Sequence, residues 1–444
     1  MRFNTLNAWL EWQATLNPVE IDLGLERVVE VMQRMGLARE FACPLIMVAG
    51  TNGKGSVVSL LAAMARAAGL KVGCYTSPHI ISYNERITLD GENIDDDRLC
   101  QAFERIDQAR GEVTLTYFEF GTLAAIDIFM HADADLVIME VGLGGRLDAV
   151  NVMEPDVSVI TSIALDHTDW LGDNREAIAL EKAGIMREQK PVICGETDAP
   201  ATLLDAAAQK SAQLFQLGQH YRIEPSSPGR WSLISPLGDI HDLPAPALPG
   251  EFQLGNAATA ILALQALASK LTITPVDIRR GLLQARLRGR FETLHRQPQV
   301  IVDVAHNPHA VASLVAQLQT QRIEGSTHIV LAMLADKPVD EVIELLLPIA
   351  DDWYCAGLEE NPRGLSAATM AGKIRQKLNR HVQLTQPPAD VKLCAELTVE
   401  AAIEAALGDA QPQDRIIILG SFYTVAAAID YFSRMAMRNH KAES

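Results

Sequence analysis

A glycine-rich segment, residues 50–56 with the sequence GTNGKGS, constrains the fold of this chain more than any other feature. An apolar run at residues 45–49 precedes it, and a helical pattern over residues 57–68 follows. In such a strand–loop–helix unit, backbone amides and the helix N-terminus attract an oxyanion, a lysine reaches the terminal phosphates and a serine ligates magnesium. The segment therefore predicts a nucleoside triphosphate site. Its expected nucleotide contacts are Gly53, Lys54, Gly55 and Ser56.

The loop departs from the usual phosphate-binding pattern, because it is shorter and Gly55 separates Lys54 from Ser56. A glycine-rich turn between a strand and a helix, without any ligand, is the alternative interpretation. The position of the lysine and the serine, directly after a strand, favours the nucleotide site.

Short apolar runs alternate with longer helical patterns along most of the chain, which is typical of βαβ units. The expected strands of a first series are residues 45–49, 72–76, 136–141, 157–163 and 191–195. Those of a second series are residues 300–304, 328–334, 353–356 and 416–419. Continuous apolar strands are typical of parallel sheets that are covered on both faces. We therefore expect an α/β chain, with a doubly wound, mostly parallel phosphate-loop domain followed by a smaller Rossmann-like domain.

Chain length supports two domains, because a single core stops growing at about 250–300 residues and this chain has 444. The basic segment 286–290 lies between the two series of strands and marks their junction. The expected bounds are residues 1–287 for the first domain, 288–298 for a linker and 299–444 for the second domain.

Three local patterns add detail to the first domain. Residues 25–36 predict the first amphipathic helix. Residues 225–249, rich in Pro, Ser and Gly, predict a small antiparallel excursion, and a helix is expected to begin near Gly255.

The net charge of −18 argues against binding to nucleic acid or to an anionic membrane, because both would be repelled. The six cysteines lack the spacing of a zinc site or a disulfide framework. The longest apolar stretch, residues 257–268, is too short to span a bilayer. We expect a cytoplasmic protein, and a monomer because the sequence has no coiled coil or long apolar seam.

Glu140 lies near the end of the apolar run at residues 136–141. A carboxylate there faces the crevice that open α/β sheets use for ligands. Pairing with a nearby lysine or arginine would also satisfy this charge. With a phosphate loop on a neighbouring strand, a magnesium ligand is the favoured interpretation.

Further motifs accompany the phosphate loop. They are YTSPH at residues 75–79, LGGRLD at 143–148, LDHT at 165–168, EKAG at 181–184 and DVAHNPH at 303–309. In this order they resemble the folylpolyglutamate synthase and dihydrofolate synthase family of the Mur ligase superfamily. The segment LTYFEF at residues 115–120 resembles the bacterial bifunctional members in particular. The resemblance spans both expected domains and implies a Mur-ligase-like fold.

This resemblance implies a set of metal ligands, distributed over two magnesium sites. They are Ser56, Ser77, Glu140 and His167. It also implies that Lys182 is carbamylated and lies near the metals and the substrate. The alternatives are a Ser-Pro turn for Ser77, a surface or hydrogen-bonding histidine for His167, and an ordinary helix-surface lysine for Lys182.

The resemblance assigns further ATP contacts to Asn256, Arg290 and Asp303. It places His306 and Ser421 in the second domain, where they face the cleft and help to position glutamate. The alternatives for the ATP contacts are a helix cap, a solvated linker charge and a strand-end carboxylate.

Three segments correspond to the pteroate- and folate-binding positions of bifunctional relatives. Their residues are Asp22, Leu23, Gly24 and Leu25, then Thr116, Tyr117, Phe118 and Glu119, then Leu147, Asp148 and Ala149. Without the resemblance, Leu23 and Leu25 are simply helix-core residues. Tyr117 and Phe118 are equally well explained as core aromatics.

The implied reaction is an ATP-dependent ligation of L-glutamate to 7,8-dihydropteroate and to the glutamate tail of tetrahydrofolates, through an acyl phosphate. Its expected catalytic residues are Lys54, Lys182, His167 and His306. A cell-wall Mur ligase that acts on a nucleotide-linked peptide is one alternative, disfavoured by the GKGS, TSPH and TYFE segments. An ATP-driven switch or transport ATPase is another; it would respond to a macromolecular partner instead of two small substrates.

Overall fold

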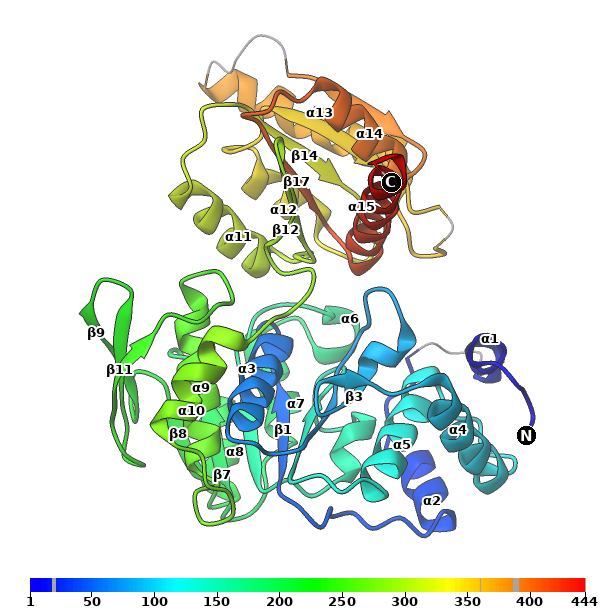
Figure 1. Cartoon of the computed structure of the whole chain (residues 1–444), viewed down its shortest axis with the longest axis vertical. Helices are drawn as coiled ribbons and strands as arrows, with labels where there is room; N and C mark the ends of the chain where they lie inside the picture. Colours follow the sequence, from blue (N-terminus) through cyan, green and yellow to red (C-terminus); the bar gives the residue numbers. More distant parts are fainter. Residues whose placement is uncertain (18–20, 360, 386–390, 444) are drawn as a thin grey trace. The chain divides into compact units, whose positions relative to one another are not determined.

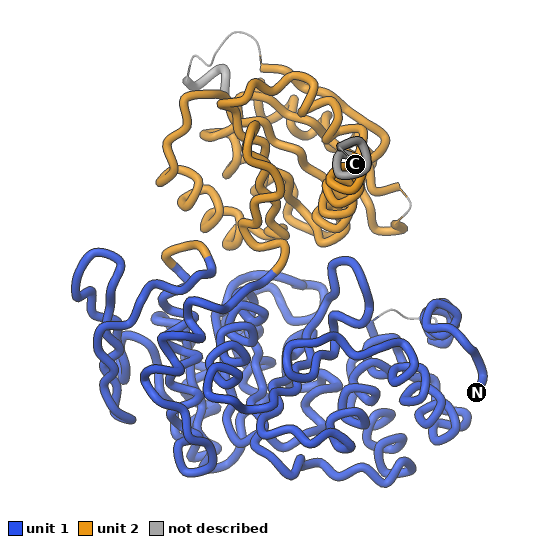
Figure 2. The backbone as a smooth tube through the Cα atoms, in the orientation of Figure 1, with its two compact units in different colours: residues 1–248, 252–287 blue, residues 249–251, 288–444 orange. Residues whose placement is uncertain are grey.

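The structure, a computed structural model, describes residues 1–17, 21–359, 361–385 and 391–443 (Figure 1). The chain forms two compact units, unit 1 with residues 1–248 and 252–287, and unit 2 with residues 249–251 and 288–444 (Figure 2). Each unit contains a mostly parallel sheet, so the expected α/β class is confirmed. None of the described helices combines the length and the apolar character that a membrane span requires.

The main sheet of unit 1 has the strand order β4-β3-β2-β5-β1-β6-β7-β8. Its strands are β1 (Leu45–Ala49), β2 (Val72–Tyr75), β3 (Ile87–Leu89), β4 (Glu92–Asn93), β5 (Leu136–Glu140), β6 (Val157–Ile160), β7 (Pro191–Cys194) and β8 (Gln213–Gln216). In the part of this order that runs β2-β5-β1-β6-β7-β8, neighbouring strands pair in parallel. Strands β3 and β4 add an antiparallel edge beside β2.

Helices cover both faces of this sheet, as the side chains of β1 show. Leu45, Met47 and Ala49 belong to one core, and Ile46 and Val48 belong to the other. A strand buried on both faces carries apolar residues at every position, and this is why its bounds could be predicted from the sequence.

The first core contains residues of α1, α2, α4, α5, α7 and α8, and the second contains residues of α3, α9 and α10. The helical segments of unit 1 are α1 (Leu6–Leu16), α2 (Glu26–Arg34), α3 (Lys54–Ala67), η1 (Tyr83–Arg86), α4 (Asp96–Arg110), α5 (Tyr117–Met130), η2 (Ala149–Val152), α6 (Thr168–Leu171), α7 (Arg175–Ala183), α8 (Ala201–Gln209), α9 (Phe252–Gln265) and α10 (Pro275–Gln284). The helix that the sequence predicts at residues 25–36 is α2. It is not the first helix of the chain, because α1 precedes it. Helix α9 begins at Phe252, so the expected start near Gly255 was wrong.

The expected antiparallel excursion is confirmed. It is the three-stranded sheet β11-β10-β9, formed by β9 (Arg222–Ser227), β10 (Arg230–Ile234) and β11 (Ile240–Pro244). Trp231 and Leu233 of β10 are buried in the second core, so this sheet packs on the second core of unit 1.

Unit 2 contains a sheet with the strand order β12-β13-β17-β14-β15-β16. Its strands are β12 (Glu292–Arg296), β13 (Gln299–Asp303), β14 (Thr327–Leu331), β15 (Asp352–Ala356), β16 (Leu393–Glu396) and β17 (Arg415–Leu419). Its helices are α11 (Pro308–Thr320), α12 (Val339–Leu346), α13 (Ala367–Thr385), α14 (Val399–Asp409) and α15 (Phe422–Glu443). Residues 292–296, part of the stretch expected as a linker, form β12, which pairs antiparallel with β13.

Candidate functional site

The C-terminal ends of neighbouring parallel strands meet at one edge of the unit 1 sheet. Strands β2, β5, β1 and β6 are consecutive in the strand order. Ser77 follows β2, Glu140 ends β5, the phosphate loop at residues 50–56 follows β1, and His167 lies on the segment after β6. Ligands of open α/β sheets bind at this edge, so the strand order brings the expected nucleotide and metal residues of unit 1 to one side of the sheet.

The phosphate loop has a conformation that requires glycine at position 53. Gly53 has φ +87°, and a Cβ atom built there would lie only 2.9 Å from the Asn256 Oδ1 atom. Asn256 therefore lies against the loop, although it belongs to α9. Lys54 Nζ donates to the carbonyl oxygens of Gly50 and Thr51 at 3.0 and 3.4 Å. The ammonium group is thus folded over the loop, where a phosphate-binding lysine belongs.

The segment after β6 holds the loop in place. The Thr161 hydroxyl donates to the Asn52 carbonyl at 2.6 Å, and the Asn52 amide donates to the Ser162 hydroxyl at 3.1 Å. Sequence reasoning missed both residues. The polar pair directly after an apolar strand was the available signal, because hydroxyls there can satisfy the backbone of an adjacent loop.

A third missed residue, Gln253, connects two expected ligand contacts. Its side-chain amide donates to the Ser56 hydroxyl at 3.2 Å and accepts from the Asn256 amide at 2.9 Å. Gln253 is buried, so it fixes the positions of both side chains. It lies one turn before Asn256 on α9, which could not be inferred while the helix was expected to begin near Gly255.

Glu140 is buried with 5% of its surface exposed, and its Oε2 atom accepts from the Ser77 amide at 3.4 Å. The same oxygen lies 4.0 Å from where a Cβ of Gly55 would be, next to Ser56. Glu140 offers carboxylate oxygens close to the backbone of Ser77 and of the phosphate loop, and carboxylate and hydroxyl oxygens are hard ligands that suit magnesium. These residues therefore fit the metal that the sequence predicts.

His167 precedes α6 and has φ +50°, in the left-handed region. Its amide donates to Asp166 Oδ1 at 2.9 Å, and its Nε2 atom lies 3.9 Å from the same oxygen. Within the described residues, no group of three or more His, Cys, Asp or Glu side chains is arranged to hold a metal ion. The role of His167 as a metal ligand therefore stays a prediction.

Lys182 is buried on α7 with only 2% of its surface exposed, so the helix-surface alternative is wrong. Burial lowers the pKa of its amine to about 7, and the charge of Lys54 acts in the same direction, whereas Asp166, Asp148 and Glu181 oppose the shift. A buried lysine with this pKa is largely neutral above neutral pH and can act as a nucleophile.

The end of α7 packs closely against the glycine-rich segment at residues 143–148. A Cβ on Gly145 would lie 3.1 Å from the Cα of Lys182, and a Cβ on Gly184 would lie 2.3 Å from the Cα of Arg146. The Arg146 amide donates to the Glu181 carbonyl at 2.8 Å. The two motifs LGGRLD and EKAG, distant in sequence, therefore form one packed element that positions Lys182.

In unit 2, the expected residues gather at the C-terminal ends of the paired strands β13 and β17. Asp303 ends β13 and accepts from the amides of Phe291 and Ala305 at 2.9 and 2.8 Å. Burial raises the pKa of Asp303, and the charge of Arg290 opposes this rise. Arg290 and His306 both lie near the ring of Phe422, at 5.9 Å for the guanidinium carbon and 6.3 Å between ring centroids.

Ser421 directly follows Gly420 after β17, and it is buried. Its hydroxyl accepts from the Thr424 amide at 3.0 Å and lies 2.6 Å from the Thr424 hydroxyl. This contact is typical of the first turn of a helix, here α15. The structure therefore gives Ser421 a structural role, and its role toward glutamate stays a prediction.

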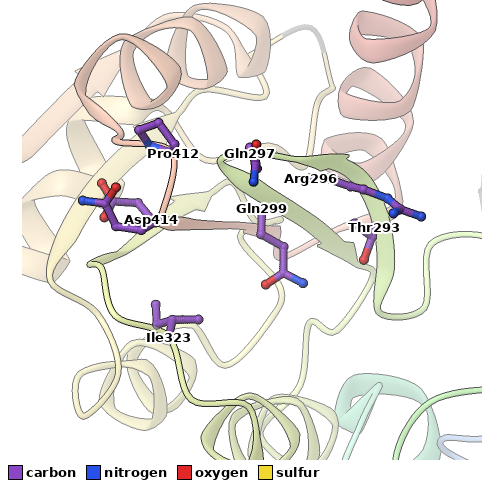
Figure 3. A pocket seen from close by; sticks show the side chains of 8 residues that line it. Thr293, Arg296, Gln297, Gln299, Ile323, Pro412 and Asp414 are labelled. Carbon is purple, nitrogen blue, oxygen red and sulfur yellow. The ribbon is translucent and has the colours of Figure 1, made fainter.

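A pocket of about 830 Å³ in unit 2 lies elsewhere (Figure 3). Thr293, Arg296, Gln299, Ile323 and Asp414 are among its lining residues. Gln299 begins β13 and Asp414 precedes β17, so this pocket is at the opposite end of these strands from Asp303. It contains none of the residues that the sequence singled out.

Comparison with known proteins shows the family to which the chain belongs. The Mur ligase middle domain family matches residues 48–264, and the family described as Mur ligase, glutamate ligase domain, matches residues 289–422. The dihydrofolate synthase/folylpolyglutamate synthase of Escherichia coli K12 is 42% identical over 426 residues, which cover 96% of this chain and 95% of that protein. The chain belongs to the dihydrofolate synthase/folylpolyglutamate synthase family of Mur ligases.

Other members of this family are similar over equal lengths. The protein of the same name from Haemophilus influenzae is 38% identical, over 95% of this chain and 96% of its own. The structure of Escherichia coli FolC in complex with DHPP and ADP has a TM-score of 0.89 at 40% identity, and the match covers 98% of this chain and 99% of that one. A bifunctional folylpolyglutamate synthase/dihydrofolate synthase with Mn, AMPPNP and L-glutamate bound has a TM-score of 0.85 at 42% identity, over 96% and 98%.

Family membership settles the fold and the enzyme class. The Mur-ligase-like fold is confirmed, and the chain is an ATP-dependent carboxylate–amine ligase. The switch or transport ATPase and the cell-wall ligase are excluded by the same finding. The roles of the individual site residues remain predictions.

Two of the three expected pteroate segments are joined in the structure. Arg27 of α2 pairs with Asp22 at 2.7 Å and with Glu119 at 3.0 Å. Thr116 and Glu119 form a capping box at the start of α5, with bonds of 2.7 and 3.2 Å. These residues therefore have structural roles that also fix where Tyr117 and Phe118 lie.

The third segment lies beside Lys182. Asp148 is buried and accepts from the amides of Leu143 and Val150 at 2.8 and 3.0 Å. Burial raises the pKa of Asp148 to about 7, although these hydrogen bonds and the charge of Lys54 oppose the rise. Leu147 is half-buried and Ala149 is buried.

Proposed function

We propose that this chain ligates L-glutamate to 7,8-dihydropteroate, and to the glutamate tail of tetrahydrofolates, in an ATP-dependent reaction through an acyl phosphate. The observation that carries this proposal is the match to bifunctional relatives over nearly the whole of both chains. The position of the phosphate loop, Glu140 and Lys182 at one edge of the unit 1 sheet supports it.

The nucleotide is bound by the loop residues Gly53 to Ser56, with Lys54 at its terminal phosphates. Asn256, and in unit 2 Arg290 and Asp303, are proposed as further ATP contacts. Ser56, Ser77, Glu140 and His167 are proposed as magnesium ligands in two sites. The bound metal supplies positive charge that neutralises the transferring phosphoryl group.

The acceptor is bound by residues 22–25, 116–119 and 147–149. Its carboxylate attacks the γ-phosphorus of ATP in line, which breaks the bond to the β–γ bridging oxygen and gives an acyl phosphate and ADP. The amine of L-glutamate then attacks the acyl carbon, and inorganic phosphate leaves. Lys54 stabilises charge on the transferring group, and His306 and Ser421 of unit 2 position L-glutamate.

The discriminating assay follows ADP formation with magnesium and L-glutamate, and compares dihydropteroate, tetrahydrofolate and no acceptor, with products weighed by mass spectrometry. We expect turnover with both acceptors and a product that is heavier by one glutamyl residue. Turnover with tetrahydrofolate alone would restrict the function to polyglutamylation. Absence of turnover with either acceptor would refute the folate proposal. The same preparation, analysed by light scattering, tests the expected monomer.

Lys182 is proposed to react as a neutral amine with CO₂, forming a carbamate and releasing one proton. The carbamate places a negative group beside Lys54, whose charge already lowers the pKa of the Lys182 amine. With ¹³C-bicarbonate we expect one carbamate carbon signal by NMR, absent from a Lys182→Met variant. A spectrum that is identical for the two proteins would contradict the modification.

Lys182 also predicts a pH dependence of stability in CO₂-free buffer. Its folded-state pKa of about 7 lies below the ordinary value of 10.5. The unfolded chain therefore binds more protons between these two values, so the free energy of unfolding rises with pH in this window, by at most about 1.4 kcal/mol per pH unit. Denaturant titrations should show this slope in the wild type and a smaller slope in Lys182→Met. Equal slopes would show that Lys182 does not titrate in this way.

A further inference from the structure

Arg86 lies beside the expected metal ligands but has no assigned role. It ends η1, and its carbonyl accepts from the Thr76 amide at 2.8 Å, directly before Ser77. The backbone of Arg86 is therefore fixed next to the end of β2, at the edge of the sheet that carries the phosphate loop.

The guanidinium group of Arg86 is held by its neighbours. Its Nε atom donates to His79 Nδ1 at 2.8 Å. Its central carbon lies 5.3 Å from the ring centroid of Tyr83 and 5.6 Å from that of Tyr117. Because Nδ1 of His79 accepts this bond, the ring proton is on Nε2. Stacking and the hydrogen bond to His79 orient the planar group without neutralising its charge.

Arg86 differs from other partly buried arginines of unit 1. Arg27, Arg110 and Arg187 each pair with at least one carboxylate at 3.0 Å or less. Within the described part of the chain, Arg86 makes no ion pair with a carboxylate. Glu85, its neighbour, has its carboxylate bound by the amides of residues 80–82. A partly buried cation is usually paired with an anion, so a bound ligand is expected to supply the anion here.

A second polar group in the same cluster also lacks a partner. The Tyr83 hydroxyl is buried and has no hydrogen-bond partner among the described residues. Tyr83 packs edge-on against Tyr117, with ring centroids 5.6 Å apart. The cluster therefore combines an unneutralised cation, an unsatisfied hydroxyl and aromatic faces, which together match an aromatic acid.

Arg86 connects the two functional regions of unit 1. Tyr117, which it contacts, belongs to the segment proposed to bind the acceptor, and Thr76, which it also contacts, precedes Ser77. We propose that Arg86 binds a carboxylate of the folate acceptor. The inference rests on the proposed function. The fork of a guanidinium matches a carboxylate with two parallel hydrogen bonds.

Two carboxylates of the acceptor have this chemistry. One is the reacting carboxylate, which is the benzoate carboxylate in dihydropteroate and the γ-carboxylate of the glutamate tail in tetrahydrofolate. The other is the α-carboxylate of the glutamate tail, which dihydropteroate lacks. In either case tetrahydrofolate loses a contact when Arg86 is replaced.

The test measures acceptor binding to full-length Arg86→Gln and wild-type protein by calorimetry, in the presence of MgADP. We expect the Kd of tetrahydrofolate to rise about 10- to 100-fold, the range for hydrogen bonds to charged groups, and the Kd of MgADP to stay within about twofold. Arg66→Gln is the matched control, because Arg66 pairs with Asp90 on the surface of the same unit and contacts no expected site residue.

Carboxamide analogues identify the carboxylate through double-mutant cycles. If Arg86 binds the reacting carboxylate, tetrahydrofolate γ-amide binds wild type and Arg86→Gln alike. If Arg86 binds the α-carboxylate, tetrahydrofolate α-amide binds wild type and Arg86→Gln alike. The inference is overturned if Arg86→Gln binds tetrahydrofolate as the wild type does, or if both amides lose as much affinity as the acid.

If the melting temperature shows that Arg86→Gln does not fold, the same cycle is measured with Arg86→Lys. This variant keeps the positive charge but lacks the forked guanidinium group. Wild-type protein that binds neither acceptor would refute the proposed function instead, so the two failures are distinguishable.

Discussion

A Lys54→Met variant is expected to lose about 100- to 1,000-fold in kcat/KM, the loss found when one preorganised donor to a developing charge is removed. Lys54 Nζ donates a hydrogen bond to a carbonyl oxygen of the phosphate loop, that of Gly50, at 3.0 Å. Methionine keeps the apolar length of the side chain, so the change removes the charge with little loss of packing. The measurement is steady-state ADP formation at saturating L-glutamate and acceptor.

The control for this variant is Lys190→Met. Lys190 is half-exposed and pairs with Asp156 at 3.6 Å, a surface ion pair that contributes about 0–1 kcal/mol. We expect its kcat/KM to stay within about twofold of wild type, as such pairs rarely matter to activity. If Lys54→Met retains more than a tenth of wild-type activity, the proposed role of Lys54 is wrong.

The second large effect is expected from Gly184→Ala, at the end of α7. The backbone of Gly184, with φ −58° and ψ −23°, is open to alanine, so no conformational strain arises. The added Cβ would lie 2.3 Å from the Cα and 2.8 Å from the amide nitrogen of Arg146. Backbone atoms cannot move aside cheaply, so we expect a loss of about 1–3 kcal/mol in the free energy of unfolding, the usual range for overpacking.

Activity should fall together with stability in Gly184→Ala, because the helix that moves carries Lys182. Gly372→Ala is the matched control. Gly372 lies inside α13, and a Cβ there would meet no atom within 4 Å. Alanine is favoured over glycine in a helix by about 0.5–1 kcal/mol, so this variant should be slightly stabilised. Equal unfolding midpoints for the two variants in urea would refute the proposed contact.

The sequence predicts the central strands well, because they are buried on both faces. Residues 45–49 were predicted as a strand with the bounds that β1 has. The strands that it missed are short or lie toward sheet edges: β3, β4, β8, β12 and β16. Edge strands alternate polar and apolar residues or are very short, so their apolar signal is weak. The excursion β9–β11 was found because its turn residues are distinctive.

Contacts between distant segments were the part that could not be predicted. The motifs around Gly145 and Gly184 were each identified, but their mutual packing depends on tertiary structure. Arg27 pairs with Asp22 nearby and with Glu119, which is 92 residues further along the chain, without a local pattern. The burial of Lys182, which distinguishes it from a surface lysine, is likewise visible only in the folded chain.

The central claim is that the acceptor carboxylate is activated by direct transfer of a phosphoryl group. The most direct test uses dihydropteroate with both carboxylate oxygens labelled with ¹⁸O, together with ATP, magnesium and L-glutamate. Attack of the carboxylate on the γ-phosphorus, followed by displacement of phosphate by the amine, predicts one ¹⁸O atom in each phosphate released and one in the new amide. Phosphate without ¹⁸O would show that the carboxylate was never phosphorylated, and would contradict the account.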